Sequence, residues 1–198
     1  MAAVSVMGRF QDVYAERGLE PAPPVTIVGP EALPEPCRQL LHHRRNMTPM
    51  LEAFVGAPAT LHVHAKRLSL QDYKLSRVIT LECDGIPVEL SSVVIHLDSL
   101  PEDLHDRIIE GAAPLGTMLI EFGIDQHSDP HDYLQCRRDP LIDSMLGLTK
   151  DDDDEFVYGR VNRLVTADGF VICDLVEIIP GPARLQAIET QRGARSDA

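Results

Sequence analysis

The sequence predicts an α+β domain in which helices flank an antiparallel sheet. Two long apolar hairpins carry this prediction, together with the helical segments that lie between them. The first hairpin joins residues 75–83 to residues 86–97 through Asp84-Gly85, a dipeptide typical of tight hairpin turns. The second joins residues 156–165 to residues 170–179. Hairpins that alternate with helices are typical of a sheet with helices packed against it.

Both hairpins are apolar on both of their alternating faces. This is unusual for an antiparallel sheet that has one face in water. The pattern therefore predicts a cover over the second face, which could be helices, a dimer partner or a closed internal cavity.

Two helices are predicted from their end signals. Thr48 as N-cap and Pro49 in the first turn indicate a helix that ends at Gly56. A capping-box pattern, Ser99 with Glu102, indicates a helix over residues 101–109. Weaker signals predict an amphipathic helix over residues 5–17, short helices over 115–122 and 141–146, and one short strand over 133–136.

Proline content divides the chain into three predicted parts. Residues 1–36 form an N-terminal helix followed by an extended arm, because six prolines lie between positions 21 and 36. Residues 37–180 form the main domain. Residues 181–198 form a charged tail rich in small residues, which we expect to be flexible.

The composition excludes several classes of partner. The 198 residues carry a formal net charge of −13, which disfavours contact with nucleic acid and with anionic membrane surfaces. No segment approaches the roughly 18 consecutive apolar residues of a membrane helix. The four cysteines are widely spaced and are predicted to be reduced thiols. We therefore expect a soluble, cytoplasmic protein.

Four segments, in this order along the chain, resemble the chorismate pyruvate-lyase (4-hydroxybenzoate synthase) family. They are Asn46-Met47-Thr48, the strand Ser76–Leu81 that leads into Asp84-Gly85, the run Ala113-Pro114-Leu115-Gly116, and the last hairpin from Tyr158-Gly159-Arg160 to Glu177-Ile178-Ile179-Pro180. The resemblance covers residues 47–180. An insertion of about ten residues around 140–154 and the N-terminal arm depart from the family pattern.

The resemblance implies both a fold and an activity. The fold would be a single antiparallel sheet of about six strands with an internal ligand cavity. The activity would be the biosynthetic elimination of pyruvate from chorismate to give 4-hydroxybenzoate, by a lyase that uses no metal and no organic cofactor. The partner would be a small anionic metabolite, either chorismate or another aromatic acid, and the protein would be a monomer or a homodimer.

The resemblance also assigns site residues. Arg77 would bind a substrate carboxylate and Glu177 would act as acid and base, with Asp174 as the other candidate on the same strand. The substrate pocket would contain Met47 and Leu115. Thr48 and Gly116 lie in the same motifs, and the charges of Arg160 and Arg163 add these two residues to the expected substrate-binding set.

The residues themselves leave alternatives open at these positions. Arg77 lies inside a strongly apolar strand, where an unpaired charge would cost several kcal/mol, so it needs either a ligand or a buried partner such as Glu177 or Asp174. Glu177 could exchange a proton with a ligand or pair with Arg163 across the hairpin. Arg160 and Arg163 either add positive potential to the cavity or face solvent.

Rival functions also remain. The same architecture resembles the effector-binding domain of GntR-type transcription regulators, which would make the chain a sensor of small carboxylates without catalysis. A biosynthetic enzyme with another substrate on the same scaffold is a further alternative. A metal site is not expected, because His62 and His64 share a strand face but lack the further ligands that such a site requires.

Overall fold

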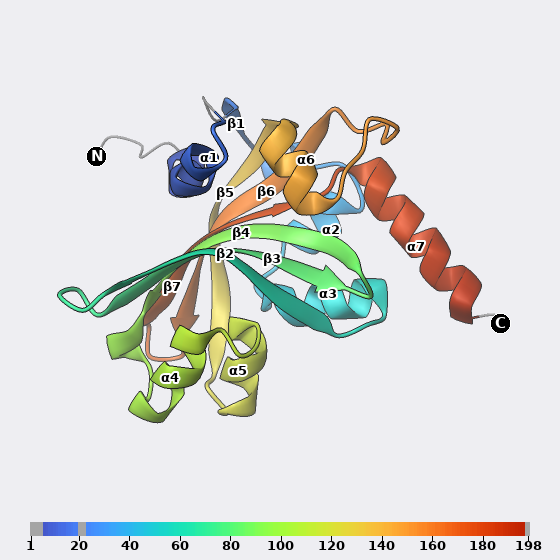
Figure 1. Ribbon diagram of the computed structural model, residues 1–198. Coiled ribbons are helices and arrows are strands. Elements are labelled where there is room, and N and C mark those ends of the chain that lie inside the picture. Colours follow the sequence, from blue (N-terminus) through green and yellow to red (C-terminus); the bar gives the residue numbers. More distant parts are fainter. Residues whose placement is uncertain (1–5, 20–22, 197–198) are drawn as a thin grey trace.

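A computed structural model describes residues 6–19 and 23–196, so Ser5 and residues 20–22 of the predicted helix and arm lie outside it. The chain forms one seven-stranded antiparallel sheet in the order β1-β5-β6-β7-β4-β3-β2 (Figure 1). The predicted α+β class is confirmed. The strands are β1 (Val25–Val28), β2 (Ala59–Ser69), β3 (Lys74–Cys83), β4 (Ile86–His96), β5 (Gln126–Arg137), β6 (Phe156–Thr166) and β7 (Val171–Ile179).

The two hairpins form the middle of the sheet. Asp84 and Gly85 join β3 to β4 with φ of 53° and 75°, and two successive left-handed residues make the turn that matches the twist of a hairpin. β6 and β7 form the second hairpin, and the two hairpins meet where β4 pairs with β7. Residues from both hairpins therefore lie side by side on each face.

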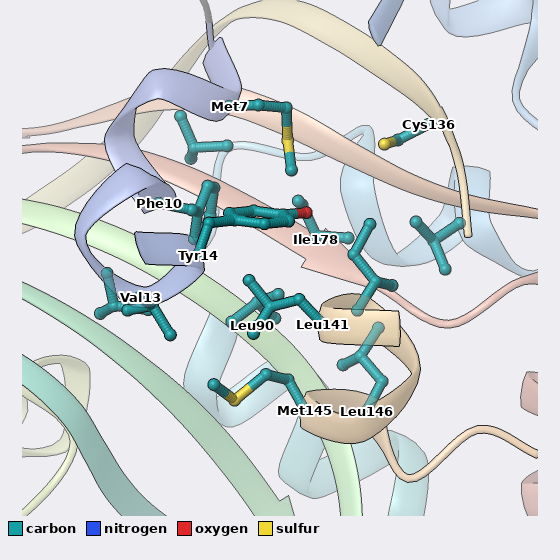
Figure 2. Packing of buried hydrophobic residues seen from close by; sticks show 14 of the residues in the cluster. Met7, Phe10, Val13, Tyr14, Leu90, Cys136, Leu141, Met145, Leu146 and Ile178 are labelled. Carbon is teal, nitrogen blue, oxygen red and sulfur yellow. The ribbon is translucent and has the colours of Figure 1, made fainter. Parts of the chain in front are cut away.

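Helices cover one face of the sheet near its centre. The 3-10 helix η1 (Val6–Phe10), α1 (Gln11–Glu16) and α6 (Pro140–Leu146) pack there against apolar residues of the sheet that include Leu90, Val157 and Val176. Figure 2 shows Phe10 and Tyr14 of the first helices reaching toward Leu141 and Met145 of α6. These helices and the strands beneath them form one apolar cluster.

The opposite face carries two separate groups of helices. α2 (Cys37–Leu41), α3 (Met47–Val55) and α7 (Pro182–Ser196) form one apolar cluster with the sheet. The second cluster contains η3 (Leu97–Ser99), α4 (Glu102–Glu110) and α5 (Leu115–Glu121). Figure 1 shows α4 and α5 grouped at one end of this face and α3 at the other. Helices therefore cover both faces of the sheet, which is the first of the three alternatives predicted from the sequence.

Several local predictions differ from the structure. β5 has 12 residues, whereas the sequence predicts a strand over residues 133–136 alone. β1, which comes from the proline-rich arm, pairs with β5 as the seventh strand. The 3-10 helix η2 (Pro30–Ala32) follows β1. The N-cap of α3 is Asn46 rather than Thr48. The hydroxyl of Ser99 donates to the carbonyl of His96, so the expected capping box does not form. The C-terminal tail forms α7, in which Leu185 and Ile188 are buried.

The four cysteines are unpaired and buried. No helix in residues 6–19 and 23–196 is long and apolar enough to cross a membrane. Over the same residues, no group of three or more potential metal ligands comes together.

Candidate functional site

A cavity lies on the sheet face that carries two helix groups, at the junction between them. Its volume, measured as the space that the centre of a water molecule can occupy, is about 40 Å³. One water needs roughly 10–15 Å³ on this measure. Its lining comes from the starts of α3 and α5 with their N-cap residues and from strands β2, β3, β4, β6 and β7: Asn46, Met47, Thr48, Leu61, Arg77, Ile79, Leu81, Glu89, Ser91, Val93, Pro114, Leu115, Gly116, Leu164, Leu175 and Glu177.

The starts of α3 and α5 form the roof of this cavity. The Asn46 side chain accepts a hydrogen bond from the backbone N–H of Thr48 and thereby caps α3. The same side chain lies directly against Gly116 of α5, where an added Cβ would overlap its amide nitrogen. Gly116 therefore allows the two helix starts to approach each other, and it is needed for space because its φ is not left-handed.

Arg77 is the cation in the cavity wall. Its side chain is only 3% exposed, and one guanidinium nitrogen, Nη1, donates to the carbonyl of Ile108 at the end of α4 at 3.4 Å. Its Nε is buried and has no hydrogen-bond partner among the described residues. Burial lowers the pKa of Arg77 to about 10, so the guanidinium stays charged at neutral pH.

Glu177 has a different guanidinium partner from the one the sequence suggested. Its Oε2 accepts from Nε of Arg160 at 2.5 Å and from Nδ2 of Asn162 at 3.1 Å. Arg160 is fully buried, and its Nη1 also donates to the carbonyls of Leu41 and His43. The pair therefore fastens the segment that leads into α3.

The charge of Arg160 also acts on the nearby imidazole of His43. Burial, followed by repulsion from Arg160, lowers the pKa of His43 to about 4. This imidazole is therefore neutral at physiological pH, and the positive charge of Arg160 is balanced by Glu177.

Glu89 and Ser91 are cavity residues that the sequence reasoning missed. Both lie on β4 and are buried, with exposures of 3% and 1%. A signal was present in the sequence, because Glu89 stands between the apolar residues Val88 and Leu90 of a predicted strand. A buried acid at such a position requires an explanation.

The structure brings six of the predicted site residues to the cavity: Met47, Thr48, Arg77, Leu115, Gly116 and Glu177. Arg160 lies behind Glu177. Asp174 and Arg163 pair with each other at 2.9 Å, and Asp174 also contacts His96. Because side chains alternate along β7, Asp174 faces away from the cavity that Glu177 lines.

The arrangement offers one charge to a ligand. Arg160 and Glu177 neutralise each other, whereas Arg77 has no carboxylate partner among the described residues. The rest of the wall is mainly apolar, with hydrogen-bonding groups from Asn46, Ser91 and Glu89. A small organic anion matches this combination of a buried guanidinium and apolar walls.

The sequence matches no protein-family profile and no curated protein. Solved structures do match. The effector domain of PhnF from Mycobacterium smegmatis shares 15% identity over 69% of this chain and 89% of that one, with a TM-score of 0.50. Full-length PhnF shares 16% identity over 69% and 64%, with a TM-score of 0.48. A GntR-family transcriptional regulator from Bacillus cereus shares 12% over 61% and 90%, with a TM-score of 0.42.

These comparisons correct the predicted identity. The assignment to the chorismate pyruvate-lyase family is wrong, because no family profile matches the sequence and the structure that matches with a TM-score of 0.50 is the effector domain of PhnF. The prediction of a lyase that converts chorismate to 4-hydroxybenzoate is wrong on the same finding, and the acid/base role of Glu177 was part of it. At this level of identity the comparison with the PhnF effector domain shows a shared fold.

Proposed function

We propose that this chain is a non-catalytic ligand-binding domain that holds a small carboxylate against Arg77. The observation that carries the proposal is the buried guanidinium of Arg77, which lines a cavity and has no carboxylate partner among the described residues. The effector-domain alternative raised by the sequence has this function. The fold shared with the effector domain of PhnF supports the same choice.

The energetics of Arg77 favour an anionic ligand. A buried donor without a partner costs about 1–3 kcal/mol, and more when the group is charged. Its one hydrogen bond, to the carbonyl of Ile108, is long at 3.4 Å. A carboxylate placed in the cavity could accept from two guanidinium nitrogens at once, which is the geometry that arginine offers and lysine does not.

A role in transcription would require a further component. The net charge of −13 opposes direct contact between this chain and DNA, so DNA binding would come from another domain or chain. That the chain by itself has no nucleic acid partner stays a prediction. Its metabolite partner would be a small organic acid whose body packs against Ile79, Leu81 and Leu115.

Calorimetric titration with benzoate and its uncharged analogue benzamide tests the proposal. Benzoate is expected to bind and benzamide to bind at least tenfold more weakly, because only benzoate compensates Arg77. In Arg77→Ala, benzoate affinity should fall about 30-fold or more, which corresponds to the roughly 2 kcal/mol or more lost when a buried charge pair loses one partner. Arg77→Lys should recover only part of it.

Arg163→Ala is the matched control, because it removes an arginine of β6 whose side chain lies on the opposite face of the sheet from the cavity. Its benzoate affinity should equal that of the wild type. Equal binding of benzoate and benzamide, or full benzoate affinity in a folded Arg77→Ala protein, would refute the proposal.

A further inference from the structure

Glu89 is a buried acidic residue in the wall of the cavity. Binding of a carboxylate at Arg77 gives no reason for an acidic side chain there. It lies on β4 opposite Leu81 of β3 and is 3% exposed. Its Oε2 is buried and has no hydrogen-bond partner among the described residues. The neighbouring hydroxyl of Ser91 donates to the backbone carbonyl of Val176. One carboxyl oxygen therefore lies in the cavity wall with its hydrogen-bonding capacity unused.

The charged and titratable groups around Glu89 come from three strands. β7 contributes Glu177, β6 contributes Arg160 and β3 contributes the thiol of Cys83. The cavity-lining residues of α3 carry no charge, since they are Asn46, Met47 and Thr48. Arg160 is already bonded to Glu177 at 2.5 Å, and Glu89 forms no ion pair with any cation of the described residues.

These surroundings favour the protonated form of Glu89. Burial raises its pKa most, and repulsion from Glu177 raises it further, while Arg160 and the Ser91 hydroxyl lower it by less. The net result is a pKa well above the usual range of a glutamate. A protonated carboxyl group is a hydrogen-bond donor, which an ionised one is not.

The charge balance limits the ligand to one negative charge. With Glu89 protonated and Glu177 neutralised by Arg160, the net charge of the cavity is that of Arg77. Arg77 pairs with Val93, four residues along β4 from Glu89, so the two backbones are roughly 13 Å apart along the strand. A second ligand carboxylate at the Glu89 end would lie beside two acidic side chains and far from Arg77.

Resting on the proposed function, we infer that Glu89 donates a hydrogen bond from its protonated carboxyl group to the end of the ligand that is remote from Arg77. The ligand class is then a monocarboxylate with a neutral hydrogen-bond acceptor at its other end. Dicarboxylates are rejected, and binding of the preferred class becomes linked to pH through Glu89.

Two nearly isosteric probes test this inference. 4-Carbamoylbenzoate carries one charge and a carbonyl acceptor, whereas terephthalate carries a second carboxylate in the same place. At pH 8, calorimetric titration should show at least tenfold tighter binding of 4-carbamoylbenzoate. Its affinity should weaken by up to tenfold per pH unit above the pKa of Glu89, and buffers of different ionisation enthalpy should report proton uptake on binding.

Glu89→Gln should abolish the pH dependence of 4-carbamoylbenzoate binding, because the amide donates at every pH. Glu82→Gln is the control, since Glu82 lies on β3 beside exposed His62 and outside the cavity lining. It should retain the wild-type pH profile.

Thermal unfolding of the ligand-free protein gives a second measurement that needs no ligand. A raised pKa in the folded state means that wild-type stability falls as pH rises from the usual glutamate range through the raised pKa. Glu89→Gln should remove this fall, so its melting temperature should exceed that of the wild type at pH 8 by more than at pH 5.

The failure of each idea has its own pattern. If benzoate binding depends on Arg77 but terephthalate and 4-carbamoylbenzoate bind equally and without pH dependence, the inference about Glu89 is overturned and the carboxylate site stands. If no carboxylate binds and Arg77→Ala changes nothing, the proposed function fails and the inference fails with it.

Discussion

Two ion pairs between arginine and an acidic residue cross the β6–β7 hairpin, and they differ in burial. Arg160 is paired with Glu177 and Arg163 with Asp174, each directly across β6 and β7. The first pair is buried, with side-chain exposures of 0% and 3%, and its atoms are 2.5 Å apart. The second is exposed at 48% and 25%, with a distance of 2.9 Å.

The difference lies in what else each pair contacts. Taking both charges of a buried pair out of water costs several kcal/mol per ion, and further hydrogen bonds must offset that cost. Arg160 has two such bonds to backbone carbonyls, and Glu177 has one from Asn162. The Arg163 pair remains in contact with water and needs no such network. The two pairs have similar residue types, so the face of the sheet on which each lies decides whether it is a buried structural pair or a surface ion pair.

Removing one charge of the buried pair should have the largest effect. Glu177→Gln leaves the guanidinium of Arg160 buried without a counter-charge, and breaking a buried pair in this way costs about 3–5 kcal/mol. Urea denaturation at pH 7 measures it. Asp174→Asn is the matched control on the exposed pair, and a loss of equal size in both variants would remove the distinction between the two faces.

Removing both buried charges should cost less than removing one. Arg160→Met combined with Glu177→Leu takes away the unpaired charge and fills the space with apolar atoms, although the carbonyls of Leu41 and His43 lose their donor. We expect the double variant to be more stable than Glu177→Gln in the same urea titration. A double variant less stable than that single one would mean that the carbonyl contacts outweigh the charge pair.

The exposed pair should show the smallest effect and the clearest dependence on solution conditions. Arg163→Ala should cost at most about 1 kcal/mol at low salt and less at high salt. Burial raises the pKa of Asp174, but hydrogen bonds from Arg163 and His96 outweigh it, and the net pKa is lowered.

The lowered pKa fixes the direction of the pH dependence. The stabilisation from Asp174 is complete above its unfolded pKa, about 3.9, and is lost as pH falls through its lower folded value. Urea denaturation of wild type and Asp174→Asn should therefore differ at pH 6 and converge at low pH. A difference that grows on acidification would contradict this assignment.

Much of the fold could be predicted from the sequence because its signals are local. The Asp84-Gly85 turn, the alternating apolar strands and the helix end at Gly56 each depend on a few neighbouring residues. β5 was largely missed, because its residues are polar and it is ordered by pairing along β6 and β1. α7 was missed for a similar reason, since burial of Leu185 and Ile188 against the domain holds a segment with weak helical signals.

The candidate site divides in the same way. The sequence by itself determined that Arg77 and Glu177 lie in apolar strands and that both therefore need partners. Only the tertiary structure decided which partners they have: Glu177 is bonded to Arg160, and Arg77 faces a cavity. Strand register and the packing of helix starts set these distances, and both depend on residues far apart in the chain. The burial of Glu89 in the cavity wall depends on the same long-range packing.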